Sequence, residues 1–165
     1  MSFTDLLVNQ QPDEPAKVYI SGAIPGSRDL GHKVLYQHAA HVFHDAGISV
    51  YIPHLHPAPT AGQARAMTPE EVFDRDAHHL LGARLIVAFI HEHSTGVDSE
   101  LAIAVVEEVP AVARCHAGLT PSRFTEGLLH RAGIPVHADR NAWRDIPVLL
   151  TGYANAFANT GAVSA

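Results

Sequence analysis

The stretch RLIVAFIHEHSTGVDSELAIAVVEE, residues 84–108, decides the fold of this chain. Its apolar run LIVAFI, residues 85–90, is typical of a strand that is covered on both faces of a parallel sheet. A crossover helix is expected next, with Thr95 as N-cap and Asp98 three residues later. That helix would bury an apolar stripe made of Val97, Leu101, Ala104 and Val105.

Glu100 lies at the border of that stripe. On a helical wheel of about 100° per residue it falls roughly 40° from Ala104. Glutamate is seldom buried without a partner, and removal from water raises the pKa of its carboxyl group. Two interpretations are open at this point: a solvated charge on a helix edge, or a carboxylate with a function.

The rest of the chain alternates between strand-like and helix-like segments. The further strand-like runs are KVYIS (17–21), ISVYI (48–52), VPAVARC (109–115) and IPVHA (134–138). The helix-like segments are 32–46, which ends at Gly47, one that starts at Thr68 and Pro69, one that starts at Thr120 and Pro121, and a last one from Asp145 through Phe157.

This alternation predicts an α/β fold. We expect a single domain with a doubly wound, Rossmann-like or flavodoxin-like sheet of five mostly parallel strands and helices on both faces. Flavodoxin-like strand order is the first expectation. The domain is expected to span residues 16–158, between a flexible N-terminus (1–15) and a flexible C-terminus (159–165).

Composition narrows the classes of partner. The chain has 165 residues and a net charge of -6, with no Lys/Arg cluster among aromatic residues, which argues against a nucleic-acid polymer. No basic start precedes an apolar core, and no apolar run approaches the ~20 residues of a membrane span, so we expect a cytoplasmic protein without a membrane partner. The single cysteine, Cys115, allows no internal disulfide and is expected to be buried.

In a doubly wound sheet, ligands bind beyond the carboxyl ends of the strands, where the strand order reverses. This rule selects the loops GAIPGSRDLG (22–31), PHLHPAPTAGQARAM (53–67) and HEHSTG (91–96). The first of these loops could cradle a phosphate or a ribose with backbone N–H groups of Ser21, Gly22 and Gly26. It lacks the Gly-Lys-Ser/Thr of a Walker motif and the spacing of a dinucleotide fingerprint.

Three segments together resemble the nucleoside 2-deoxyribosyltransferase family and its relatives, the (deoxy)nucleotide N-glycosidases. They are VYISGAI (18–24), FDRDAHHLLGA (73–83) with Asp76, and LIVAFIHEHSTGVDSELAIA (85–104). The most specific element has the form Ser-x-Gly-Val-x-x-Glu-Leu-x-x-Ala, made here by Ser94, Gly96, Val97, Glu100, Leu101 and Ala104.

The resemblance implies roles for individual residues. Glu100 would be the nucleophile that attacks the anomeric carbon of a nucleoside sugar, and Asp76 would contact the base and help to protonate its leaving nitrogen. Asp76 would benefit from a raised pKa, whereas a hydroxyl such as that of Tyr19 would hold Glu100 anionic. The residues expected to bind substrate are Ser21, Gly22, Ala23, Ile24, Gly26, His54, Ser94, Gly96 and Val97.

The chain contains 13 histidines, four of which form two alternating pairs, His54/His56 and His91/His93. Both pairs are expected at the ligand edge of the sheet, where they could stack on a base or, together with Asp98, bind zinc. The resemblance involves no metal, and we expect no metal and no cofactor. The other histidines, His79 among them, are expected on the surface or on helix faces.

The sequence therefore predicts an enzyme that cleaves the N-glycosidic bond of a (deoxy)nucleoside or nucleoside 5'-monophosphate, by hydrolysis or by transfer to another base. The base, the sugar and the phosphate stay open. Asp98, Ser99 and Ala102 depart from the family's usual pattern, and the alternative is a nucleotide-sensing protein of the same fold without catalysis. The helix after Gly96 is apolar nearly all round, with Ile103 and Val106 outside the stripe, so we expect a homodimer or a higher homo-oligomer.

Overall fold

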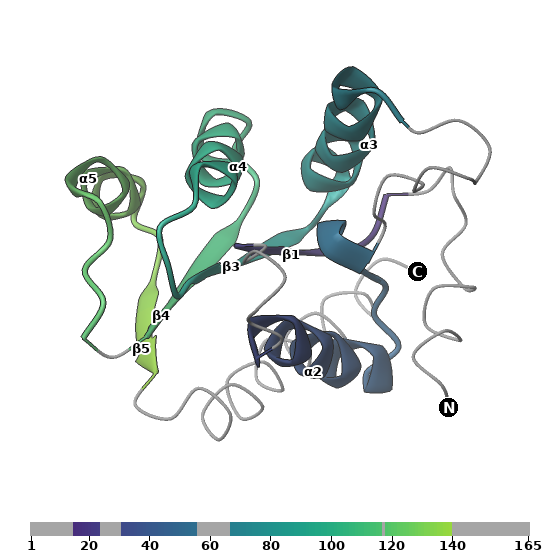
Figure 1. The fold of residues 1–165 in the computed structure, drawn as a ribbon, viewed down its shortest axis with the longest axis horizontal. Coiled ribbons are helices and arrows are strands. Elements are labelled where there is room, and N and C mark those ends of the chain that lie inside the picture. The colour runs from purple at the N-terminus through teal and green to yellow at the C-terminus, as the bar shows by residue number, and fades with distance from the viewer. Residues whose placement is uncertain (1–14, 24–30, 56–66, 117, 140–165) are drawn as a thin grey trace, which may run out of the picture.

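The computed structural model describes residues 15–23, 31–55, 67–116 and 118–139. They include a five-stranded sheet in the order β2-β1-β3-β4-β5, in which every neighbouring pair is parallel (Figure 1). The strands are β1 (Val18–Gly22), β2 (Val50–Tyr51), β3 (Leu85–Ile90), β4 (Ala111–His116) and β5 (Val136–Asp139). The predicted α/β class and flavodoxin-like order are confirmed.

Helices cover both faces of this sheet, as predicted. Helix α2 lies on one face, and α3, α4 and α5 lie on the opposite face (Figure 1). Their bounds are α2 (Gly31–Asp45), α3 (Pro69–Gly82), α4 (Thr95–Val106) and α5 (Arg123–Ala132), and a short 3-10 helix, η1 (Pro53–Leu55), follows β2. No helix in the described part of the chain is long and apolar enough to span a membrane.

Two predicted helix starts are wrong by one or two residues. The N-cap of α4 is Ser94, whose backbone is extended and whose hydroxyl accepts the N–H of Val97, so Thr95 is already inside the helix. The N-cap of α5 is Ser122, which accepts the N–H of Thr125, so Thr120 and Pro121 precede the helix. Helix α3 has the predicted Thr68 cap: the Thr68 hydroxyl accepts the N–H of Glu71, and the Thr68 N–H donates to the Glu71 carboxylate.

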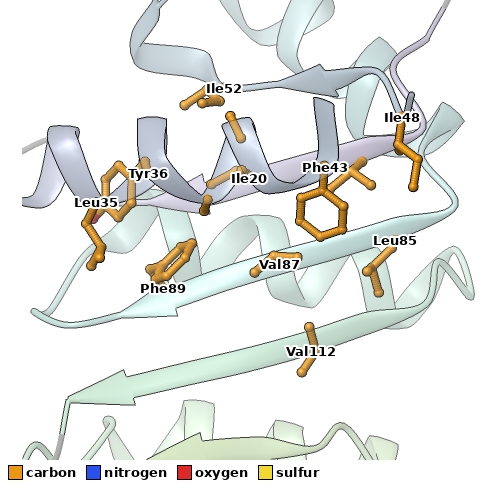
Figure 2. Packing of buried hydrophobic residues seen from close by; sticks show 13 residues of the cluster. Ile20, Leu35, Tyr36, Phe43, Ile48, Ile52, Leu85, Val87, Phe89 and Val112 are labelled. Atoms are coloured by element: carbon orange, nitrogen blue, oxygen red, sulfur yellow. The ribbon is translucent and has the colours of Figure 1, made fainter. Parts of the chain in front are cut away.

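The face under α2 holds the largest apolar cluster. Leu35, Tyr36 and Phe43 of α2 pack against β1 and β3, where they meet Ile20 and Val87 (Figure 2). Each of these side chains is at most 2% exposed. Burial of this size supplies the main favourable term in folding and holds the first strand between α2 and the opposite layer.

The opposite face contains the predicted stripe of α4. Val97, Leu101 and Ala104 are buried, whereas Val105 is only partly buried. Leu101 packs with the central strands and α5, and Ala104 packs with Tyr19, Tyr51 and other residues near α3. The predicted last helix at 145–157, the terminal segments, and the positions of Ile24, Gly26 and His56 lie outside the described residues.

Candidate active site

Two tyrosines on adjacent strands form the floor of the site. Tyr19 of β1 is the register partner of Tyr51 of β2, so both side chains point to the face covered by α3 and α4. Their ring centroids lie 5.6 Å apart. Tyr19 is fully buried and Tyr51 is 1% exposed, so each hydroxyl group needs a partner within the protein.

Glu100 of α4 is the partner of Tyr19. The Tyr19 hydroxyl donates a hydrogen bond of 2.8 Å to Oε1, and the hydroxyl of Ser21 donates a short one to Oε2. Tyr19 and Ser21 stand two positions apart on β1, so they point the same way and reach the two oxygens of one carboxylate. The predicted bond from Tyr19 to Glu100 is present in the structure.

Opposing effects act on the Glu100 carboxyl group. Burial raises its pKa most strongly, the hydrogen bonds from Ser21 and Tyr19 act in the other direction, and the negative charge of Asp76 adds to the increase, so that the net shift is upward. Burial and the nearby Glu100 charge also raise the pKa of Tyr19 far above its ordinary range. Tyr19 therefore stays protonated and remains a hydrogen-bond donor.

Asp76 of α3 is the partner of Tyr51. The Tyr51 hydroxyl donates a short hydrogen bond to Oδ1, and Arg75 reaches the same oxygen with Nε and Nη2, each at 2.9 Å. Burial and the bond to Asp76 raise the pKa of Tyr51 well above its ordinary range, so it too remains a donor. The two predicted carboxylates thus lie at one site, each fixed by a tyrosine.

Sequence reasoning missed Tyr51 and Arg75. One signal for Tyr51 was present: the tripeptide VYI occurs at 18–20 and again at 50–52, at matching positions of two strands that pair. His79 was also placed wrongly, because it is 6% exposed and its ring stacks on Tyr51 with centroids 3.9 Å apart. Its Nδ1 accepts the N–H of Ala16 at 3.2 Å.

Gly22 and Ala23, at the end of β1, contact helix α2. A Cβ atom at Gly22 would overlap the ring of Tyr36, and the Tyr36 hydroxyl donates a 3.1 Å hydrogen bond to the carbonyl oxygen of Ala23. His54 lies near the same ring, with centroids 5.5 Å apart. The structure therefore places these three predicted substrate-binding positions around Tyr36, on the α2 side of the sheet edge.

The other predicted positions lie at the start of α4, one turn before Glu100. Ser94 caps the helix, Gly96 is exposed, and Val97 is buried in the core beneath α4 and α5. Among the described residues, no group of three or more His, Cys, Asp or Glu side chains is arranged to hold a metal ion. Asp98, once a candidate ligand, instead accepts a 2.7 Å hydrogen bond from Thr125 of α5.

One curated protein and two solved structures are similar to this chain. No family model matches the chain. A curated protein of Methanosarcina barkeri (strain Fusaro / DSM 804), named "Putative 2'-deoxynucleoside 5'-phosphate N-hydrolase 1", is 30% identical over 96 residues. This match agrees with the resemblance to the nucleoside 2-deoxyribosyltransferase family and its N-glycosidase relatives that the sequence motifs carry. It covers 58% of this chain and 59% of the relative, so the chain spans less than two thirds of that relative's length.

Two solved structures are also similar. A conserved protein from Enterococcus faecalis V583 has a TM-score of 0.66 and 18% identity over 87% of this chain and 99% of its own, which supports the fold alone. A 2-deoxyribosyltransferase from Bacillus psychrosaccharolyticus is 22% identical over 59% of this chain and 72% of its own, with a TM-score of 0.46, too low to indicate a common overall fold.

Proposed function

We propose that this protein cleaves the N-glycosidic bond of a (deoxy)nucleoside or nucleoside 5'-monophosphate through a covalent bond between the sugar and Glu100. The observation that carries the proposal is the Glu100 carboxylate, which has each oxygen fixed by a hydroxyl group of β1. A carboxylate fixed in this way is suited to attack one carbon atom from one direction. The name of the Methanosarcina relative, an N-hydrolase, supports the cleavage of an N-glycosidic bond.

In the proposed reaction, Glu100 attacks the anomeric carbon while the bond from that carbon to the base nitrogen breaks. The transition state resembles an oxocarbenium ion, so a fixed anion beside the sugar stabilises it. The electron pair of the broken bond stays with the base, whose leaving nitrogen takes up a proton from solvent; in hydrolysis the attacking water later gives one back. Water or a second base then attacks the same carbon and releases Glu100, which gives hydrolysis or transfer respectively.

Tyr19 and Ser21 contribute by keeping the attacking carboxylate in place. Burial makes the charged form of Glu100 costly, and the two donors offset part of that cost without neutralising the charge. Asp76 is proposed to contact the base and to help its leaving nitrogen gain a proton, as the family resemblance implies. Its position beside Tyr51, next to Tyr19, supports a role close to the bond that breaks.

The test is incubation of the purified protein with nucleosides and 5'-monophosphates, ribo and deoxy, with and without a second free base. Chromatography would detect released or exchanged base. Glu100→Gln should reduce release to a small residual rate, because the neutral amide cannot form the glycosyl ester. Glu107→Gln is the matched control, since Glu107 is an exposed carboxylate at the end of the same helix and should leave the rate unchanged.

The same assay separates the enzyme from the nucleotide-sensing alternative. A sensor would bind a nucleoside monophosphate and release no base after long incubation, and Glu100→Gln would then change no rate. Asp98, one of the departures from the family pattern, bonds to Thr125 and so has a packing role in this chain. The departure at Asp98 therefore does not favour the sensor over the enzyme.

A further inference from the structure

We propose that Tyr51 and Arg75 are positioning residues that occupy one oxygen of Asp76 and so reserve its other oxygen for the leaving base. This inference rests on the proposed function and deepens it, because it states which atom of the site meets the base. It also assigns a part to two residues that the sequence did not single out.

The hydrogen bonds that Asp76 makes with other described residues all fall on one oxygen of its carboxyl group. Oδ1 accepts from the Tyr51 hydroxyl and from Nε and Nη2 of Arg75. Within the described ranges no donor reaches Oδ2. A carboxylate oxygen has about two lone-pair sites, so three donors saturate Oδ1 and leave Oδ2 as the acceptor for a ligand.

Tyr51 and Arg75, the two donors to Asp76, are themselves fixed by contacts with other residues. The ring of Tyr51 is stacked on His79, and His79 is tied to the backbone N–H of Ala16. Arg75 reaches the sulfur of Met67 with Nη1 at 3.5 Å. Because both donors approach one oxygen from fixed side chains, the carboxyl group cannot turn out of this orientation without breaking charge-assisted hydrogen bonds.

The arrangement also explains how two carboxylates can share one site. Asp76 lies close enough to Glu100 for its charge to disfavour ionisation of Glu100. The guanidinium group of Arg75 sits directly on Asp76 and balances that charge locally. With its charge balanced by Arg75, Asp76 can accept a hydrogen bond from an N–H of the base through Oδ2. It then holds the base in place while the leaving nitrogen takes a proton from solvent, and Glu100 remains the anion beside the sugar.

The test uses Tyr51→Phe, which removes the hydroxyl and keeps the ring that stacks on His79. We expect kcat/KM for a natural nucleoside substrate to fall roughly tenfold to a hundredfold, the range for loss of a hydrogen bond to a charged group. A glycoside of the same sugar with nitrophenolate as leaving group, which needs no proton and offers no N–H, should lose much less. Arg75→Lys should show the same dependence on the leaving group, since an ammonium group cannot present two N–H groups at the same spacing.

Thr125→Val is the matched control. It also removes a buried hydroxyl that donates to a carboxylate, that of Asp98, but at the interface between α4 and α5. We expect it to lower stability and to leave the ratio of the two rates unchanged. Tyr51→Phe with wild-type rates, or with equal losses on both leaving groups, would overturn the inference, because a purely structural role lowers both rates together.

Binding distinguishes failure of this inference from failure of the proposed function. In the Glu100→Gln background, where turnover is too slow to disturb a binding measurement, adding Tyr51→Phe should raise the Kd of a nucleoside monophosphate roughly tenfold and leave that of ribose 5-phosphate unchanged. If Tyr51→Phe leaves the Kd of the nucleotide unchanged, the proposed role of Tyr51 is rejected even when the wild type is an active enzyme. A wild type that releases no base, together with the expected change in Kd, would reject the catalytic function and retain the base contact.

Discussion

Removal of the Tyr19 hydroxyl should slow the reaction while the fold persists. In Tyr19→Phe, Glu100 loses the 2.8 Å hydrogen bond to Oε1 and keeps the one from Ser21 to Oε2. A hydrogen bond to a charged group contributes about 1.5–3 kcal/mol, so kcat/KM should fall roughly tenfold to a hundredfold if the bond persists in the transition state. The phenyl ring still fills the buried site, so the variant should fold.

The pH dependence of kcat/KM adds a second readout. The Tyr19 bond favours the ionised form of Glu100, so its loss should raise the Glu100 pKa further. Because Glu100 must be ionised to attack, the acidic limb of the profile should move to higher pH. The measurement is base release followed by chromatography at a series of pH values, with folding checked by circular dichroism.

A double variant isolates the interaction between the two residues. In the Glu100→Gln background, adding Tyr19→Phe should have little further effect on the residual rate, because the two residues act as one unit. The reasoning is refuted if Tyr19→Phe retains the wild-type kcat/KM and pH profile. It is also refuted if the effects of the two substitutions multiply, since that would mean Tyr19 acts on the substrate independently of Glu100.

Three further predictions concern stability and assembly. Burial raises the Glu100 pKa, so charging this group costs folding free energy: the cost is absent below the pKa of the unfolded chain and complete above the raised folded value. Glu100→Gln should therefore raise Tm at neutral pH, by an amount that disappears as the pH falls through this window, and equal Tm values at all pH would contradict it. Gly22→Ala should destabilise by about 1–3 kcal/mol in urea unfolding because the added methyl group overlaps Tyr36, whereas Gly127→Ala, which faces open space within α5, should be neutral or stabilising; equal effects would refute the steric argument. Val106 is 76% exposed at the end of α4, so we propose that a second copy of the chain covers it; light scattering should give a dimer or larger assembly that Val106→Glu weakens, and a monomeric wild type would reject the proposal.

The elements that could be predicted from the sequence are those with one dominant local signal. The continuous run LIVAFI gives a strand with both bounds as predicted, since every residue from Leu85 to Ile90 is buried. Strand β2 was predicted over 48–52 and contains only Val50 and Tyr51, and the chain enters the 3-10 helix η1 at Pro53 directly afterwards. Ile48 and Ile52 are nevertheless buried, so the apolar pattern located the segment but not the length of its ladder.

In the candidate site, too, only the features that depend on local sequence could be predicted. Glu100 could be placed at the border of a buried helix face because helical spacing is a local property of the sequence. The pairing of Tyr51 with Asp76 depends on the register between β1 and β2 and on the position of α3 over both strands. These contacts join residues 25 or more positions apart in the sequence, so the spacing of residues within one segment cannot predict them.

Strand β1 connects the core to the site through the alternation of its side chains. Val18, Ile20 and Gly22 face α2, where Tyr36 fills the space above Gly22, while Tyr19 and Ser21 face Glu100 on the other side. Side chains in a strand alternate with a period of two, so a slip of one residue would exchange the two sets and remove both donors from Glu100. The apolar packing under α2 therefore does more than stabilise the fold: it fixes the register that places two hydroxyl groups on one carboxylate.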